Sequence, residues 1–183
     1  MALQYTGDGS YNIYLGIELP EYWSLNRGNA SNDTKLRSNL LRNEFADWAP
    51  VLQDWIKHST GQIHAWPLYA MPIDLLCWKP VRGLTLIRDA AHVSTPFVGE
   101  GVNCSMFDSL QLALEIVQSG LEGLEGAVAR YEQAMFPRAI DLIARSTASG
   151  EMLFAYDAAE RVRSIIAKMS AEPESRAQSA ADA

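Results

Sequence analysis

Three residues whose side chains could carry chemistry lie close together in the stretch LTLIRDAAHVSTPFVGEGVN, residues 84–103. Asp89 and His92 are three positions apart, and Arg88 directly precedes Asp89. Either pairing, Asp89 with His92 or Arg88 with Asp89, could serve as an acid/base or charge-stabilising pair in a pocket. Alternatively, His92 bonds the backbone of a turn and Arg88 is solvated, so the spacing alone leaves both roles open.

The same stretch has the features of a binding loop. An apolar strand is predicted to end just before Asp89, whose carboxylate could accept hydrogen bonds from ligand hydroxyl groups. Pro96 and Phe97 would form a stiff apolar wall. Gly99 and Gly101 would let backbone N–H groups face the ligand, and the positive end of the following helix would favour an anionic or electron-rich group. A plain strand-to-helix connection has the same pattern.

Four large apolar or aromatic residues precede this loop: Trp66, Tyr69, Met71 and Trp78. They could line an apolar pocket for an aromatic or polycyclic ligand, although such residues are more often part of a core. His64 lies on a predicted strand among them and faces either that pocket or the far side of the sheet. The histidines lack metal-ligand spacing, so we expect no metal site. The two cysteines are expected to be buried thiols in a reducing compartment.

The elements that position these residues can be predicted from periodicity. Alternating apolar residues over 11–17 predict a strand, and helical spacing predicts a helix after residue 33, followed by a second helix that Pro50 opens. The segments 61–71, 75–80 and 83–87 are predicted strands, separated by hairpin-like links. This order favours an α+β fold, with an antiparallel sheet of substrate-domain type that carries a helical insertion and is followed by a C-terminal helical bundle.

The second half of the chain is predicted to be helical. A helix from Gly101 should bury a stripe made of Val102, Met106, Leu110, Ala113, Leu114 and Val117. A longer helix over 123–149, kinked at Pro137, and a last helix over 152–169 follow. We expect one substrate-domain-like unit over 1–169 and a disordered polar tail over 170–183.

Composition excludes several classes of partner. The net charge of −7 and the absence of a basic run with interleaved aromatic residues argue against nucleic acid and against anionic membranes. No apolar run approaches the length of about 18 residues that spans a bilayer. The first residues lack the features of a secretory signal, so a cytoplasmic location is expected.

The motif around the binding loop resembles GDAAH…P(F/P)xG(Q/E)GxN of FAD-dependent aromatic hydroxylases, the flavoprotein monooxygenases that include tetracycline-inactivating enzymes. The residues that carry the resemblance are Asp89, Ala90, Ala91, His92, Pro96, Phe97, Gly99, Glu100, Gly101, Val102 and Asn103. The segments YNIYLGIELPEYW, LLRNEFADWAPVLQDWI and YEQAMFPRA are also similar to that family. The match covers only the C-terminal half of such enzymes.

The resemblance implies roles for these residues. Asp89 would hold the ribityl chain of FAD, and the loop from Pro96 to Asn103 would lie along the isoalloxazine ring. Glu100 would orient the start of the helix. A full-length relative would hydroxylate its substrate with NAD(P)H and oxygen, while the protein positions the flavin and excludes water.

Two departures from the family bear on the function. The chain contains no GxGxxG after a strand, the motif of the N-terminal Rossmann segment that grips the ADP part of FAD. Arg88 stands where the family has glycine, and its side chain would fill the space that glycine leaves for the cofactor. Both departures favour a chain that binds no FAD by itself.

Three functions therefore remain open, and the two departures favour the first. The first is an enzyme of secondary metabolism that uses no bound FAD and promotes cyclisation or isomerisation of an apolar small molecule, with Arg88, Asp89, His92 and His64 as candidate catalytic residues. The second is the substrate-pocket half of an FAD- and NAD(P)H-dependent monooxygenase, which is truncated or completed by a second chain. The third is a non-catalytic binding protein. In each case the helical face would need a cover, either a homodimer or a partner chain.

Overall fold

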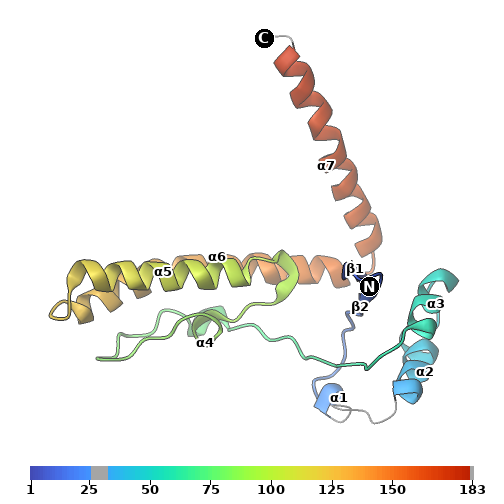
Figure 1. The fold of residues 1–183 in the computed structure, drawn as a ribbon, viewed down its shortest axis with the longest axis horizontal. Helices are drawn as coiled ribbons and strands as arrows, with labels where there is room; N and C mark the ends of the chain where they lie inside the picture. Colours follow the sequence, from blue (N-terminus) through green and yellow to red (C-terminus); the bar gives the residue numbers. More distant parts are fainter. Residues whose placement is uncertain (26–32, 182–183) are drawn as a thin grey trace. The chain divides into compact units, whose positions relative to one another are not determined.

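The structure is a computed structural model that describes residues 1–25 and 33–181. The chain divides into two compact units, Met1–Pro67 and Leu68–Ala183. A single unit over 1–169 stays a prediction. A two-stranded antiparallel sheet followed by helices gives an α+β chain with a helical C-terminal region, as the sequence predicts (Figure 1).

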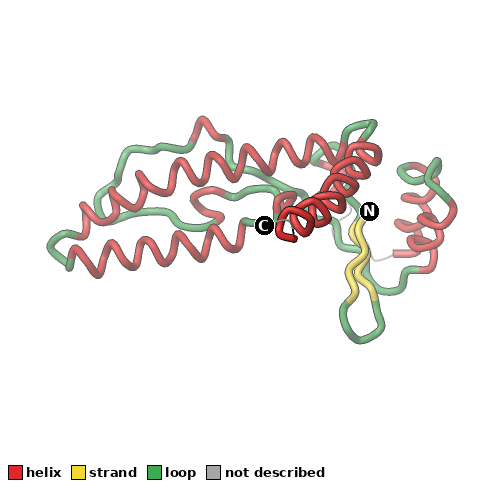
Figure 2. Tube along the Cα trace, turned by 90° about the horizontal axis from the view of Figure 1, so that it is seen from above, coloured by secondary structure: helices red, strands yellow, loops and turns green. Residues whose placement is uncertain are grey.

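The first unit begins with a β-hairpin, which Figure 2 shows as a pair of yellow strands. Strand β1, Ala2–Tyr5, pairs antiparallel with β2, Tyr11–Tyr14, so that Ala2 faces Tyr14 and Tyr5 faces Tyr11. The sequence predicts β2 as a longer strand over 11–17 and gives no sign of β1. The Asp8 carboxylate fixes the turn, because it accepts hydrogen bonds from the amide and hydroxyl of Ser10 and from the hydroxyl of Thr6.

Three helices complete the described part of the first unit: α1, Tyr22–Leu25; α2, Asp33–Asn43; and α3, Pro50–His58. Apolar residues at helical spacing were expected to face inward on α2 and α3, and a buried cluster of Leu36, Leu40, Phe45 and Ile56 confirms this in part. Val51 and Trp55, which were also expected inside, are exposed. Pro50 opens α3 as expected, because the first turn of a helix has no use for its missing N–H. The sequence predicts that Asn32 or Asp33 caps α2, and Asn32 lies outside the described residues.

The second unit starts with a long extended segment that carries two short elements, the 3₁₀ helix η1, Ile73–Leu75, and the helix α4, Asp89–His92. The predicted strands over 61–71, 75–80 and 83–87 are wrong, because the described chain forms no strand there and only an isolated bridge between Val81 and Leu84. Side chains hold the segment on a helix instead. The indole N–H of Trp78 and the hydroxyl of Thr85 both donate to Oε1 of Glu132, over 3.0 and 2.8 Å.

Three long helices follow the second 3₁₀ helix η2, Pro96–Val98: α5, Gly101–Ser119; α6, Leu124–Phe154; and α7, Ala158–Ala181. Helices α5 and α6 run side by side in both views (Figures 1 and 2). The core cluster of this unit takes four residues from one face of α6, namely Tyr131, Met135, Ala139 and Ile143. Pro137 lies inside α6, and its predicted kink stays a prediction.

The expected disorder of residues 170–183 at the end of the chain stays a prediction. Helix α7 continues to Ala181 and so includes most of residues 170–183. Five of the fourteen residues over 170–183 are alanine, which has the highest helix propensity, whereas Pro173 has the lowest.

The face that α5 buries was predicted wrongly. Its apolar stripe is exposed: Val102 and Val117 are 73% and 80% accessible, and Met106, Leu110 and Leu114 are also exposed. The helix instead turns the face of Asp108 toward α6, because Asp108 pairs there with Arg138. No helix in the described ranges is both long enough and apolar enough to cross a membrane.

Candidate cofactor-binding loop

The candidate site begins at Arg88, whose backbone has φ 60° and ψ −145°. Glycine adopts this region readily, whereas a residue with a side chain is strained in it by about 1 to 3 kcal/mol. The conformation is held because the Arg88 carbonyl accepts hydrogen bonds from the amides of Ala91 and His92, over 2.8 and 2.9 Å. The exposed side chain makes one long hydrogen bond, from Nε to the hydroxyl of Ser109 over 3.4 Å.

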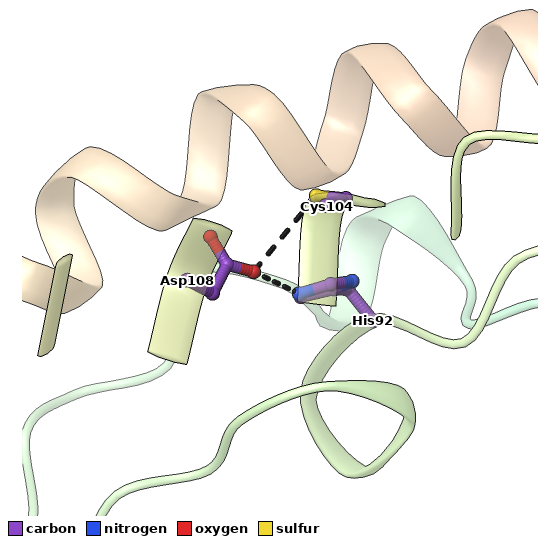
Figure 3. A group of neighbouring side chains, drawn as sticks. All are labelled: His92, Cys104 and Asp108. Carbon is purple, nitrogen blue, oxygen red and sulfur yellow. Dashed lines mark hydrogen bonds and ion pairs between the residues drawn. The ribbon is translucent and has the colours of Figure 1, made fainter. Parts of the chain in front are cut away.

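The structure separates the acid/base pair that the spacing suggested. Asp89 is the first residue of α4 and its side chain is exposed, whereas His92 is only 3% accessible. His92 bonds Asp108 on α5 instead, with 2.5 Å between Nε2 and Oδ2 (Figure 3). Asp89 therefore remains available to a ligand, while His92 is part of the packing below it.

Asp108 is the centre of a buried charged network that the sequence did not reveal. Its Oδ1 accepts a hydrogen bond from Nη2 of Arg138 on α6 over 2.8 Å, and its own side chain has no accessible surface. Burial alone raises the pKa of Asp108, but the hydrogen bonds from His92 and Arg138 outweigh burial and hold this pKa below its usual value. The network thus joins α4, α5 and α6 through one ionised carboxylate.

Cys104 lies one helical turn before Asp108 and completes the group drawn in Figure 3, with 3.9 Å between Sγ and Oδ2. Burial, followed by the negative charge of Asp108, raises the pKa of the Cys104 thiol, so the thiol is a poor nucleophile. Cys104 is half-buried and Cys77 is exposed, so the prediction of two buried thiols is wrong for Cys77. The reason is that Cys77 lies on the extended segment, not inside a sheet.

His92, Cys104 and Asp108 offer ligand atoms within 4.8 Å of one another, the one such group found among the described residues. Both oxygens of Asp108 are already engaged, one by His92 and one by the guanidinium of Arg138. A cation 2.8 Å from the carboxylate opposes the binding of a second cation. The arrangement therefore suits a structural ion-pair network better than a metal site, and the expected lack of a metal stays a prediction.

Helix α6 holds the loop that follows α4. The hydroxyl groups of Thr95 and Ser146 lie 2.8 Å apart, and Ser146 also donates to the carbonyl of Thr95. Arg145 binds Glu100 through two parallel hydrogen bonds of 3.0 and 2.7 Å. These bonds lower the pKa of Glu100. Because both of its carboxylate oxygens bind Arg145, the side chain makes no capping hydrogen bond to α5.

The glycines of the motif shape the junction with α5. Gly99 has φ 69° and ends η2, and a Cβ added there would meet no atom within 4 Å. Gly101 is the first residue of α5, and the amide of Cys104 makes the first hydrogen bond of the helix, to Glu100. The backbone N–H groups of Gly101, Val102 and Asn103 lie in the first turn of α5, where the helix itself offers them no acceptor. No side chain among the described residues caps this turn.

The predicted pocket residues are divided between the two units, and a common pocket stays a prediction. His64 and Trp66 belong to the first unit, where both are exposed and their rings lie 6.4 Å apart. Met71 and Trp78 pack against the core cluster of the second unit, which is the alternative that the sequence left open for them. Tyr69 is exposed in the second unit. Phe97 is half-buried against α6.

Three curated relatives show what the chain is similar to, whereas no protein-family model matches it. It is 34% identical to Monooxygenase penA of Penicillium thymicola over 125 residues, which cover 57% of this chain and 28% of the relative. It is 31% identical to Monooxygenase asqM of Emericella nidulans, over 61% of this chain and 30% of the relative. It is also 27% identical to an FAD-dependent urate hydroxylase of Klebsiella oxytoca, over 80% of this chain and 35% of the relative.

The chain is a homologue of part of the FAD-dependent monooxygenases. The resemblance inferred from the loop motif is thereby confirmed. This monooxygenase homologue spans about a third or less of the length of the relatives it matches.

Proposed function

We propose that the chain supplies the flavin-facing loop of an FAD-dependent monooxygenase, and that a GxGxxG-bearing part completes the cofactor site. The conformation of Arg88 carries this proposal. The loop keeps a backbone shape that suits glycine, although it carries a strained arginine there. Strain of this kind persists where the surrounding structure fixes the backbone, and it is typical of ligand-binding segments.

The residues at the junction fit a flavin in part. The exposed carboxylate of Asp89 can accept hydrogen bonds from the ribityl hydroxyls. The uncapped first turn of α5 offers backbone amides to the electron-rich edge of the ring system. The guanidinium of Arg88 is the element that does not match the family, although its exposed position leaves it free to move aside or to contact a phosphate.

The chain's own contribution would be to position and to shield. A bound flavin would supply oxygen-dependent hydroxylation with NAD(P)H. Asp89 would orient the cofactor, Phe97 would form an apolar wall beside it, and the loop held on α6 would limit the entry of water. The substrate would be an apolar aromatic or polycyclic small molecule of secondary metabolism.

The exposed stripe of α5 supports the need for a cover. Its apolar side chains follow one another at helical spacing from Val102 to Val117 and lie open to solvent. We propose that the remaining part of the enzyme, or a second copy of this chain, packs on the stripe.

A second candidate function is cofactor-free cyclisation or isomerisation of such a molecule. It is favoured by one observation, the replacement of the family glycine by Arg88, whose charged side chain would stand in the flavin's place. Arg88 and Asp89 would then stabilise charge in the reacting molecule. His92 has no direct part in this reaction, because it is buried and paired with Asp108.

Titration with FAD separates the two candidates when the chain is completed by the GxGxxG-bearing part of a relative. The wild-type sequence, Asp89→Ala and Arg88→Gly would each be followed in this completed form by the change in flavin absorbance and fluorescence. If the chain faces a flavin, the wild type perturbs the flavin spectrum and Asp89→Ala weakens this effect. If Arg88 has replaced the flavin, only Arg88→Gly perturbs the spectrum. No perturbation and no turnover of candidate substrates by any variant would leave a binding protein.

A further inference from the structure

Gly150 on α6 lies directly against the ring of Phe97. A Cβ added at Gly150 would come within 2.8 Å of Cδ2 and 2.9 Å of Cε2 of that ring, which is closer than side-chain carbons approach one another. The glycine is buried inside a helix, where alanine is the better helix former. Space for Phe97, not backbone conformation, is therefore the physical reason for glycine here.

The ring of Phe97 is held from a second side by the same helix. Phe154 lies one turn after Gly150, and its ring meets that of Phe97 edge-on, with 5.7 Å between the centroids and an angle of 77°. Phe97 sits in the middle of η2, between Pro96 and the left-handed Gly99. The ring therefore fixes the part of the loop that leads into the uncapped start of α5.

The contact belongs to a continuous attachment of the loop to one face of α6. One turn before Gly150, Ser146 bonds Thr95, and the neighbouring Arg145 binds Glu100. The loop is thus attached on both sides of Phe97 by polar contacts and at its centre by the ring. These attachments come from the chain itself and require no ligand.

We propose that Gly150 is a positioning residue that forms a socket for Phe97 and so presets the shape of the loop over 95–103. The proposal rests on the proposed function in one respect, namely that this loop faces a flavin. A residue about fifty positions away in the sequence then sets the position of the apolar wall and of the α5 amides. Any side chain at Gly150 would push the wall toward the ligand.

The test compares Gly150→Ala with Gly126→Ala in the full chain. Gly126 lies on the same helix, is exposed, and its added Cβ would meet only the flexible end of Arg130. Both changes give the same gain in helix propensity, so Gly126→Ala is the matched control. Hydrogen exchange of the Gly99 and Cys104 amides reports on the loop, since these amides bond Pro96 and Glu100. The Glu44 amide in the first unit serves as a remote reference.

We expect Gly150→Ala to speed exchange at Gly99 and Cys104 by about tenfold, with no change at Glu44, and Gly126→Ala to change none of the three. Adding Phe97→Leu to Gly150→Ala should restore part of the protection, because the smaller side chain leaves room for the new methyl group. A general loss of stability would instead raise exchange throughout the unit and would not be rescued.

Equal exchange in Gly150→Ala and Gly126→Ala would overturn the proposal, as would a double variant no better protected than Gly150→Ala. If Gly150→Ala does not fold, recovery of the fold by the added Phe97→Leu supports the socket, and failure to recover contradicts it. None of these readings requires a flavin. A failed FAD titration would therefore overturn the proposed function and leave this inference standing.

Discussion

Asp108 and His92 form a buried pair that joins α5 to the end of α4, with 2.5 Å between the carboxylate oxygen and the imidazole nitrogen. The second oxygen of the same carboxylate binds Arg138 on α6. The loop that carries the family motif begins directly after His92, so this network fixes one end of the loop, while Arg145, Ser146 and Gly150 fix the rest.

Asp108→Asn should destabilise the second unit by about 2 to 3 kcal/mol, because it removes the charge that compensates Arg138. The figure is below the usual value for a fully buried pair, since the Arg138 side chain is 31% accessible. Urea unfolding of the two proteins at neutral pH measures the difference. Asp141→Asn, which removes an exposed partner of Arg145, is the control and should change stability by less than about 1 kcal/mol.

The stabilisation from Asp108 should depend on pH in a defined direction. Its pKa in the folded chain lies below the ordinary value of 3.8, so below that value the unfolded chain takes up the proton first. The stability difference between wild type and Asp108→Asn should be constant above the ordinary pKa. It should shrink as the pH falls toward the folded pKa. A difference that grows on acidification would contradict the charged network.

Arg88→Gly should stabilise the chain by about 1 to 2 kcal/mol, because glycine adopts φ 60° and ψ −145° without strain. Arg88→Ala is the control, since it removes the guanidinium but keeps the strained Cβ. Thermal unfolding of both variants separates the two causes. If alanine stabilises as much as glycine, the side-chain charge, not the backbone, is responsible.

Glu132 anchors the extended segment to α6, and its second oxygen has no hydrogen-bond partner among the described residues. Glu132→Gln keeps an oxygen that can accept from Trp78 and Thr85 and removes a buried charge, so the free energy of unfolding should equal or exceed that of the wild type. Glu132→Ala leaves both donors unpaired and should cost at least about 2 kcal/mol. Denaturant unfolding tests the pair, and the opposite order would show that the charge itself is needed.

The two cysteines should differ in reactivity. Burial and the charge of Asp108 raise the pKa of Cys104, whereas Cys77 is exposed, so iodoacetamide should modify Cys104 at least about tenfold more slowly at neutral pH. Mass spectrometry of timed samples gives both rates. Asp108→Asn should speed the reaction at Cys104 and leave Cys77 as the internal reference. Equal rates in the wild type would mean that Cys104 is not held as described.

The local elements could be predicted from the sequence because their signals are local. Leu36 and Leu40 repeat at helical spacing, and Pro50 suits a first turn, so α2 and α3 were found, whereas the short α1 was not. The extended segment was predicted as strands because its apolar residues alternate with polar ones. The same alternation arises when an extended chain packs one side against a helix and pairs with no other strand. Trp78 and Thr85 show this, since both reach Glu132 across about fifty positions.

The candidate site was predicted only where a motif marked it. The loop and the unusual Arg88 were recognised, but the partner of His92 was not, because Asp108 lies 16 positions away and Arg138 a further 30. Cys104 and Asp108 are four apart on one helix face, which was the available signal. The buried face of α5 was predicted wrongly because the regular spacing of its apolar residues was a stronger signal than the spacing of Cys104 and Asp108. The partners of Asp108 lie on two other helices, α4 and α6, and cannot be found from the sequence of α5 alone.

The most direct test of a flavin-facing loop is FAD retention in a chimera, in which this chain replaces the matching region of the FAD-dependent urate hydroxylase of Klebsiella oxytoca. We predict that the purified chimera retains FAD, and that Asp89→Ala in it weakens FAD binding by about tenfold or more while hydrogen exchange in α6 is unchanged. A folded chimera that loses FAD, although the parent enzyme retains it, would contradict the proposed function.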